Sequence, residues 1–206
     1  MSSSLDTHED SVRRETEDLV RRVREGDADA FDPLVRQHQA RVFNLAYRML
    51  NNHEEASDLT QDVFVQVFRK IGGFRGESRF DTWVYAIAVN MCRNRFRRLR
   101  RIRLFEAESL DAPRGGEDDL PPPEHAAPTA SPRDAVALKD VRRLVEQALA
   151  ALPPEFAAAV VLRDIQGLSY EEIAASMGCT MGTVKSRLSR GRMMMQMKLK
   201  TLKHEL

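Results

Sequence analysis

The segment from Leu168 to Arg192 constrains the fold more than any other part of the chain, because it has the pattern of two short helices joined by a tight turn. Ser169 and Glu172 are spaced as a capping box, which predicts a first helix from Tyr170 to about Met177. Gly178 can adopt the left-handed conformation that ends a helix. The segment is therefore predicted to be a helix-turn-helix.

The second predicted helix follows Thr180, whose hydroxyl can accept hydrogen bonds from the free amides at the start of that helix. Val184 and Leu188 are four residues apart and would pack on the first helix. Their packing partners there would be Ile173, Ala174 and Met177. The outward face is small and basic, and the helix contributes Lys185, Ser186, Arg187, Ser189 and Arg190. Such a face fits the major groove of DNA, whereas the alternative is an ordinary helical hairpin with a solvated basic side.

The composition sets limits on the other functions that are possible. The 206 residues suggest one or two domains, and 42% hydrophobic residues are enough for cores of ordinary size. No stretch is apolar and long enough to act as a signal peptide or cross a bilayer, so we expect a cytoplasmic protein without membrane insertion. Two cysteines, Cys92 and Cys179, and five scattered histidines provide no metal-ligand spacing. We therefore expect no metal, no cofactor and no enzyme activity.

A charge-segregated segment divides the chain. Basic residues run up to residue 103 and are followed by acidic residues up to residue 124. Residues 105–133 are also rich in proline and poor in large apolar side chains, which is typical of a flexible linker. We expect a disordered extension over residues 1–15, helical modules over 16–104 and 134–206, and a linker that leaves the two modules independent.

The N-terminal module is predicted to be entirely helical. A short helix over 16–24 would end at Gly26, and Asp27 would cap a longer one. That helix would bury side chains that recur at helical intervals, namely Phe31, Leu34, Val35, His38, Val42, Leu45 and Met49. A third helix is expected near 54–71 and a fourth from about Thr82. No strand pattern competes, so the predicted fold class is all-α, with two helical modules joined by the acidic linker.

The fourth predicted helix carries aromatic side chains at its start, followed by asparagine and arginine at helical spacing. This combination suits unpaired DNA, because rings can stack on exposed bases while arginines hold phosphates. The alternative is that the apolar members, Trp83, Val84 and Ile87, are core residues, as large rings in helical proteins usually are.

Three segments together resemble the extracytoplasmic-function class of bacterial sigma factors, which direct RNA polymerase to promoters. They are DLTQDVFVQVFRKI from Asp58, FRGESRFDTWVYAIAVNMCRNRFRR from Phe74 and LPPEFAAAVVLRDIQGLSYEEIAASMGCTMGTVKSRLSRGR from Leu152. The resemblance covers about Asp18 to Leu202. It implies promoter DNA and core RNA polymerase, through its largest and second-largest subunits, as partners, and an anti-sigma factor as a regulator.

The resemblance also assigns residues to three surfaces. Core-polymerase docking would use Asp58, Gln61, Asp62, Phe64 and Gln66, and the alternative there is a solvated acidic helix face. Capture of the minus-ten element would use Phe80, Trp83, Asn90, Arg93, Asn94 and Arg97. Recognition of the minus-thirty-five element, by the helix-turn-helix over 170–189 and the residue after it, would use Thr183, Lys185, Ser186, Arg187, Ser189 and Arg190.

The chain departs from the family pattern at several points. Met181 stands where many relatives have proline, and Lys185 where some have arginine, which changes the bases preferred because lysine lacks the planar fork of arginine. The linker is long, and four of the residues over 193–197 are methionines, which suit adaptable packing or a partner surface. The alternative function is a stand-alone helix-turn-helix regulator that binds a palindromic operator as a dimer.

Overall fold

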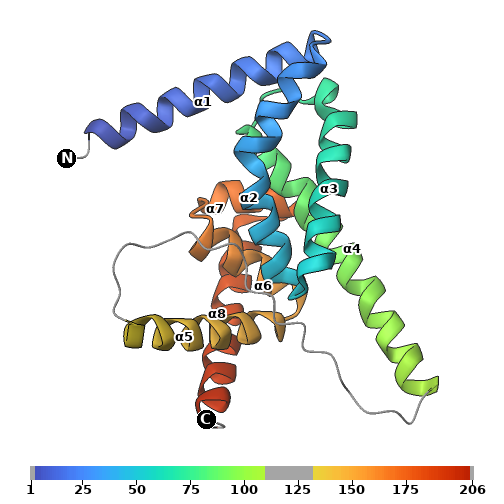
Figure 1. The fold of residues 1–206 in the computed structure, drawn as a ribbon, viewed down its shortest axis with the longest axis vertical. Coiled ribbons are helices and arrows are strands. Elements are labelled where there is room, and N and C mark those ends of the chain that lie inside the picture. The colour runs from blue at the N-terminus through green and yellow to red at the C-terminus, as the bar shows by residue number, and fades with distance from the viewer. Residues whose placement is uncertain (1–2, 110–131, 205–206) are drawn as a thin grey trace.

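The protein is built from helices in the computed structural model, which describes residues 3–109 and 132–204 (Figure 1). The N-terminal module contains α1 (Ser3–Arg24), η1 (Ala28–Ala30), α2 (Phe31–Leu50), α3 (His53–Lys70), η2 (Ile71–Gly73) and α4 (Phe80–Ser109). The C-terminal module contains α5 (Pro132–Ala150), α6 (Pro154–Val160), the π-helical turn η3 (Val161–Ile165), α7 (Tyr170–Met177) and α8 (Met181–His204). The described residues contain no strand, so the all-α prediction is confirmed.

The first helix is longer than the sequence predicted. Residues 3–15 belong to α1, whereas the sequence predicted a helix only from residue 16. No glycine or proline interrupts the chain before Gly26, and charged pairs at helical spacing support the helix, such as Arg13 Nε donating to Glu17 at 2.9 Å. Thr16 is buried and its hydroxyl lies 3.2 Å from Gln37 Oε1 of α2, which ties this helix to the module.

The next three helices form the core of the N-terminal module. Asn51 ends α2 in the left-handed conformation, and the side chain of Asn52 accepts from Glu55 N at 2.8 Å to cap α3. Such a short connection makes α2 and α3 antiparallel neighbours. Their buried faces meet the first half of α4 in a core that includes Leu34, Val42, Leu45, Leu59, Val63, Val67, Val84 and Val89.

The helix-turn-helix has the predicted geometry. Ser169 N donates to Glu172 at 2.8 Å and Glu172 N donates to Ser169 Oγ at 3.1 Å, which completes the capping box at the start of α7. Gly178 is left-handed with a φ of 60°. Thr183 N donates to Thr180 Oγ1 at 3.2 Å, so Thr180 caps α8. The predicted ends of the first helix and both caps are therefore confirmed.

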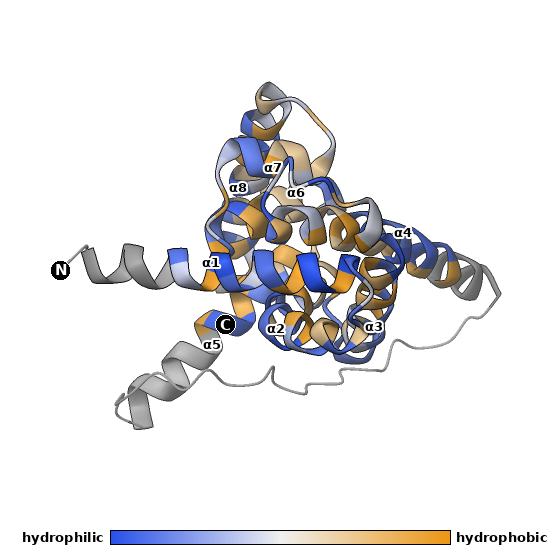
Figure 2. Cartoon of the chain, turned by 90° about the horizontal axis from the view of Figure 1, so that it is seen from above, coloured by the Kyte–Doolittle hydropathy of each residue, from blue (hydrophilic) through white to orange (hydrophobic). Residues whose placement is uncertain are grey.

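The two modules pack directly on one another, which contradicts the expectation that the linker leaves them independent. α7 lies against the start of α4, and α5 and α6 contact α2. Side chains of both modules belong to one hydrophobic cluster. Seen from above, hydrophobic segments of the helices gather in the centre of the molecule (Figure 2). The physical reason is that α4 is apolar around most of its circumference between residues 80 and 92, so it has a second face to bury.

Candidate nucleic-acid and polymerase interfaces

The N-terminal half of α8 presents the predicted basic face. Val184 is fully buried and Leu188 is 2% exposed, and both anchor the helix on the rest of the module. The side chains that this packing leaves exposed are Lys185, Ser186, Ser189 and Arg190. Every charged side chain of α8 (Met181–His204) is basic. The surface is therefore suited to phosphates and to base edges.

Three of the predicted contacts on α8 differ from their neighbours, because their polar atoms are used within the protein or are partly covered. Thr183 is half-buried and its hydroxyl lies 3.0 Å from that of Thr180. Ser186 Oγ donates to the carbonyl oxygen of Thr183 at 2.9 Å. Arg187 is half-buried, and its Nη1 has no hydrogen-bond partner among the described residues. Lys185, Ser189 and Arg190 consequently form the fully accessible part of this surface.

An aromatic cluster lies where α4 begins. The ring of Phe74, in the loop before α4, is 5.2 Å from Trp83 and 5.7 Å from Phe80. Phe80 is only 6% exposed and also contacts His38, with the two rings 5.3 Å apart. Phe80 therefore supports the cluster from the core, and its predicted role as a direct DNA contact needs correction. Trp83 and Phe74 are half-buried and remain accessible from one side.

Further along α4, the polar side chains divide between two roles. Asn90, Asn94 and Arg97 are exposed, and Arg93 is half-buried. Arg95, which alternates with them, turns back toward α3, where its guanidinium lies 2.5 Å from Glu55 and 3.1 Å from Asp62. The exposed polar positions thus form a row that leads away from Trp83, as the aromatic and basic pattern predicted.

The outer face of α3 differs from the prediction in its apolar members. Asp58, Gln61 and Asp62 are exposed and Gln66 is half-buried, but Phe64 is 6% exposed and belongs to the core. The reason is register: residue 64 lies on the same side of α3 as the buried positions 60, 63 and 67, so its ring packs into the core.

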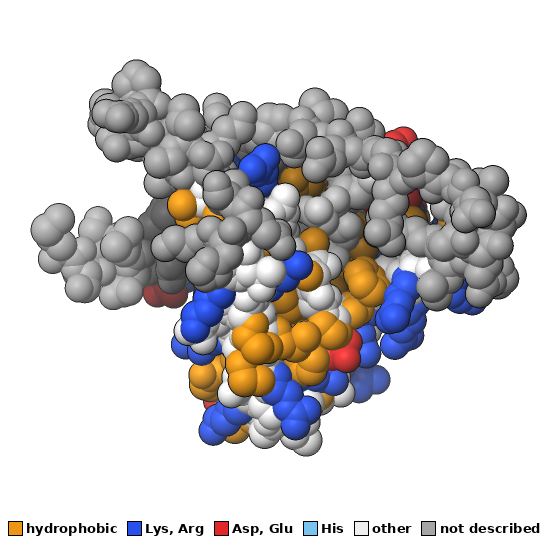
Figure 3. Space-filling model, turned by 90° about the horizontal axis from the view of Figure 1, so that it is seen from below, with side chains coloured by type: hydrophobic (Ala, Val, Ile, Leu, Met, Phe, Trp, Pro, Cys, Tyr) orange, Lys and Arg blue, Asp and Glu red, His pale blue; other side chains and the backbone are white. Residues whose placement is uncertain are grey.

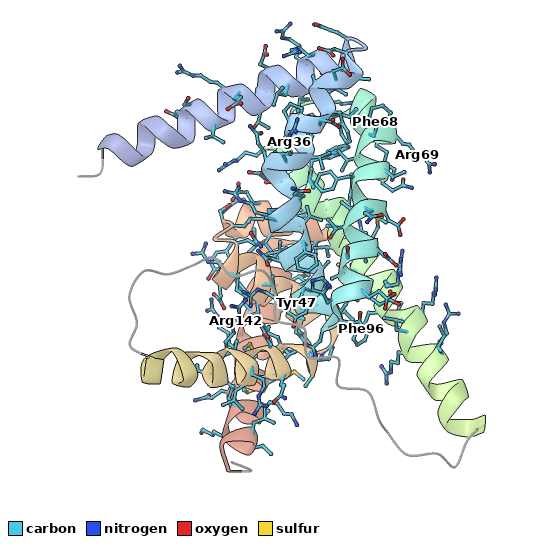
Figure 4. All side chains as sticks on the ribbon, in the orientation of Figure 1. Arg36, Tyr47, Phe68, Arg69, Phe96 and Arg142 are labelled. Carbon is cyan, nitrogen blue, oxygen red and sulfur yellow. The ribbon has the colours of Figure 1, made fainter. Side chains whose placement is uncertain are left out.

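Two apolar residues of the α3 face were missed by the sequence reasoning. Val65 and Phe68 are each 49% exposed. Val65 lies four residues after Gln61, and Phe68 lies three residues after Val65, so these side chains share one side of the helix. Phe68 lies near the C-terminal end of α3 beside Arg69, and its ring is 5.0 Å from that of Phe31 (Figure 4). The spacing of 58, 61, 65 and 68 could have identified this mixed acidic and apolar surface.

Polar contacts fix the packing of the two modules. Ser176 Oγ on α7 donates to the carbonyl oxygen of Thr82 at 3.1 Å, and the Tyr85 hydroxyl donates to Gln166 Oε1 at 2.9 Å. Arg79 lies 4.0 Å from Glu172. Burial and the nearby carboxylate of α4 raise the pKa of Tyr85 to about 12, so its hydroxyl keeps the proton that it donates.

A buried charged group stabilises the start of α4. His38 Nδ1 lies 2.7 Å from Asp81, and Arg41 and Arg79 lie 3.5 and 3.7 Å from the same carboxylate. Burial favours a higher pKa for Asp81, but the histidine and the two arginines outweigh it and hold that pKa below its ordinary value. The carboxylate therefore stays charged and holds the start of α4 to α2.

An apolar groove of about 480 Å³ lies between α5, η3 and α8. Its lining includes Val145, Leu149, Ile165, Met195 and Leu199, so the predicted adaptable packing by the methionine run holds for one of its members. Seen from below, the molecule gathers hydrophobic side chains on one area with Lys and Arg around it (Figure 3).

The described residues offer no metal-binding group of three or more His, Cys, Asp or Glu side chains. Within the same residues, no helix combines the length and the apolar character that a bilayer crossing needs.

Comparison with known proteins gives the family. Residues 34–102 match the model of Sigma-70 region 2, and residues 142–195 match that of Sigma-70, region 4. The RNA polymerase sigma-H factor of Pseudomonas aeruginosa is 36% identical over 183 residues, which cover 88% of this chain and 92% of that protein. The ECF RNA polymerase sigma-E factor of Haemophilus influenzae is 35% identical, with 89% and 95% covered. The chain belongs to the ECF RNA polymerase sigma factors.

Other similarities agree with this family. The ECF sigma factor SigE of Mycolicibacterium smegmatis is 41% identical over 165 residues, and the match spans 59% of that longer protein. The sigma factor RpoE of Bartonella quintana, solved in complex with the anti-sigma factor NepR, has a TM-score of 0.59 at 27% identity, with 82% of this chain and 96% of that one covered. CnrH, solved with the cytosolic domain of CnrY, shares the fold with a TM-score of 0.63 at 23% identity, with 91% and 98% covered.

As an ECF sigma factor, the protein acts in transcription initiation on core RNA polymerase and promoter DNA, in a family of non-enzymatic factors.

Proposed function

We propose a division of labour between three surfaces of this sigma factor. The outer face of α3, with Asp58, Gln61 and Asp62, docks on the largest subunit of core polymerase. Exposed Val65 and Phe68 add an apolar contact to that face. The half-buried ring of Trp83 and the exposed row of Asn90, Asn94 and Arg97 bind the opened minus-ten element. The accessible basic face of α8 reads the minus-thirty-five element.

The distance between the two reading surfaces supports a further part of this proposal, namely that the modules separate on the promoter. The two elements are centred about 25 base pairs apart, or about 85 Å at 3.4 Å per base pair. In the packed arrangement Ser176 contacts Thr82, and nine residues of fully extended chain from Ser176 to Lys185 span at most about 32 Å.

Trp83 and Lys185 therefore lie much too close together to read both elements at once. DNA of this length does not fold back on itself, because its persistence length is about 150 base pairs. The chain between the end of α4 at Ser109 and the start of α5 at Pro132 could span roughly 75 Å when extended, at about 3.3 Å per residue. We infer that core polymerase binds the separated form and that the acidic linker crosses a channel built for nucleic acid.

Several further assignments belong to this proposal. The apolar groove between α5, η3 and α8 suits an apolar segment of the second-largest polymerase subunit. An anti-sigma factor would bind across the two modules and hold them together; the relative RpoE of Bartonella quintana was solved in complex with the anti-sigma factor NepR. The functional units are residues 16–104 and 134–206, and the protein acts in the cytoplasm without catalytic activity of its own.

The observation that carries the proposal is the capped α8 with its exposed basic face, in a chain that also has the aromatic and basic start of α4. The test is to add the purified protein to core RNA polymerase and fragmented DNA, and to sequence the 5′ ends of the transcripts that depend on it. We expect start sites that share two upstream elements. DNA binding without polymerase, and no dependent transcripts, would support a stand-alone regulator instead.

A further inference from the structure

A cleft of about 450 Å³ opens between α1 and the loop that precedes α4. Arg13 and Arg24 of α1 line one wall, and Arg75 and Arg79 of the loop line the other. Phe74 and Phe80, two members of the aromatic cluster, also border it. The volume is within the range of sites that hold a ligand of drug-like size. The cleft is thus continuous with the rings that the proposed function places at the minus-ten element.

The charge of the cleft is positive, because five arginines line it against two glutamates. Some of these arginines are neutralised: Arg13 pairs with Glu17 at 2.9 Å, and Arg75 lies 3.9 Å from Glu77. Both are weak, exposed pairs that an anionic ligand can displace. Arg24 is exposed and forms no ion pair with any residue that the structure describes. Among the arginines that line the cleft, Arg24 is therefore the one most available to bind an anionic ligand.

Helix α1 lies outside residues 34–102, the part that matches region 2 of the sigma family. It extends from the body of the molecule and packs on α2, η1 and η2. From Arg13 to Arg24 the helix rises about 16 Å, at 1.5 Å per residue, which is long enough to face more than one phosphate of a strand. A helix beyond the matched region therefore supplies one wall of the cleft.

We propose that this cleft binds the sugar-phosphate backbone of the unpaired promoter strand, with Arg24 as the principal contact from α1. The inference rests on the proposed function, since it places the strand beside the rings that hold its bases. Single-stranded DNA fits better than duplex, because the cleft joins arginines to the half-buried ring of Phe74, the combination that holds separated bases and their phosphates. Arg79 lies 4.0 Å from Glu172 of α7 in the packed arrangement and 3.7 Å from Asp81 of its own module, so separation of the modules removes one of its two carboxylate partners.

The experiment compares Arg24→Ala with Arg14→Ala, each as the full chain bound to core polymerase. Arg14 is exposed on the same helix, forms no ion pair within the described residues and does not line the cleft, so it is a matched control. The DNA is the promoter found by 5′-end mapping, either fully paired or opened over the minus-ten element by mismatches. Affinity is measured by fluorescence anisotropy over a range of salt concentrations.

We expect Arg24→Ala to weaken binding to the opened promoter about tenfold, the usual loss for one charge-assisted contact. The slope of log affinity against log salt should fall by about 0.7, the value for one phosphate of a single strand. Arg14→Ala should match the wild type. Equal affinities of wild type and Arg24→Ala for the opened promoter would overturn the inference, as would an equal loss in the Arg14→Ala control or on fully paired DNA. If the wild type itself directs no promoter-dependent transcription, the proposed function fails instead.

Discussion

The packing of the two modules makes a quantitative prediction about the free protein. Among the described residues, Gln166 Nε2 donates to the Arg41 carbonyl at 3.4 Å, and two shorter hydrogen bonds also cross the contact, from Ser176 to the Thr82 carbonyl and from Tyr85 to Gln166. The double variant Tyr85→Phe and Ser176→Ala removes both donors and leaves the side-chain volumes almost unchanged. Each bond contributes about 0.5 to 1.5 kcal/mol. The variant should therefore lose about 1 to 3 kcal/mol from the packed arrangement, which shifts the equilibrium toward separated modules about 5- to 150-fold.

Pulsed electron–electron distance measurements between spin labels can detect this shift. Gln39 of α2 and Lys198 of α8 are exposed positions, one in each module, and both can be changed to cysteine for labelling. The native Cys179 would be changed to alanine. Cys92 can stay, because burial raises its pKa to about 12 and leaves it unreactive. The wild type should show one short distance, and the double variant should add a broad population of longer distances.

A matched variant separates opening from general loss of stability. Thr60 Oγ1 donates to the Ala56 carbonyl at 2.7 Å inside α3, away from the contact between the modules. Thr60→Val removes one buried hydrogen bond and should lower the melting temperature without lengthening the measured distance. If the double variant keeps the wild-type distance distribution, or if Thr60→Val broadens it equally, the reasoning that these two bonds hold the modules together is refuted.

Three other changes test the packing and the proposed surfaces. Gly191→Ala places a Cβ 2.9 Å from a valine methyl of α6, so it should lower the free energy of unfolding in urea by about 1 to 3 kcal/mol. Gly182→Ala on the same helix is the control. Its Cβ meets nothing closer than 3.8 Å, so this change should be neutral or stabilising. Changing Lys185 and Arg190 to alanine should weaken protection of the minus-thirty-five element in footprinting while polymerase binding persists; loss of polymerase binding would contradict the proposed surfaces. Phe68→Asp should reduce co-purification with core polymerase without a change in circular dichroism, and unchanged co-purification would remove that ring from the docking surface.

Local structure was predictable wherever a few neighbouring residues decide it. The ends of α7 follow from Ser169, Glu172 and Gly178, because a capping box and a left-handed stop depend only on residues that are adjacent in sequence. The length of α1 was not predicted, because its first residues are weakly apolar and their helix depends on side-chain pairs such as Arg13 with Glu17. Periodicity detects a buried face, and residues 10–15 of α1 are all exposed.

Long-range packing explains what the sequence reasoning missed at the site. The family resemblance assigned Phe64 and Phe80 to binding surfaces, but the register of α3 and α4 turns both rings into the core. Their neighbours Phe68 and Trp83 carry the accessible aromatic surface. Which ring of a pair faces outward depends on the helices packed around it, and a single sequence does not contain that arrangement. The packed modules were missed for the same reason.

The packed arrangement has a direct consequence for promoter affinity, because its contacts adjoin the residues proposed to read DNA. Thr82 immediately precedes Trp83, so α7 covers the backbone next to the ring that is to hold an opened base. When only the separated form can span both elements, the apparent dissociation constant equals the intrinsic one divided by the fraction of separated protein. A packed state favoured by about 3 kcal/mol leaves less than about 1% separated and weakens promoter binding more than 100-fold. Core polymerase can remove this penalty by binding the separated form, whereas a partner that bridges the two modules increases it. Under the proposed function, the same contact would keep the free protein from the promoter and make its use of DNA depend on polymerase.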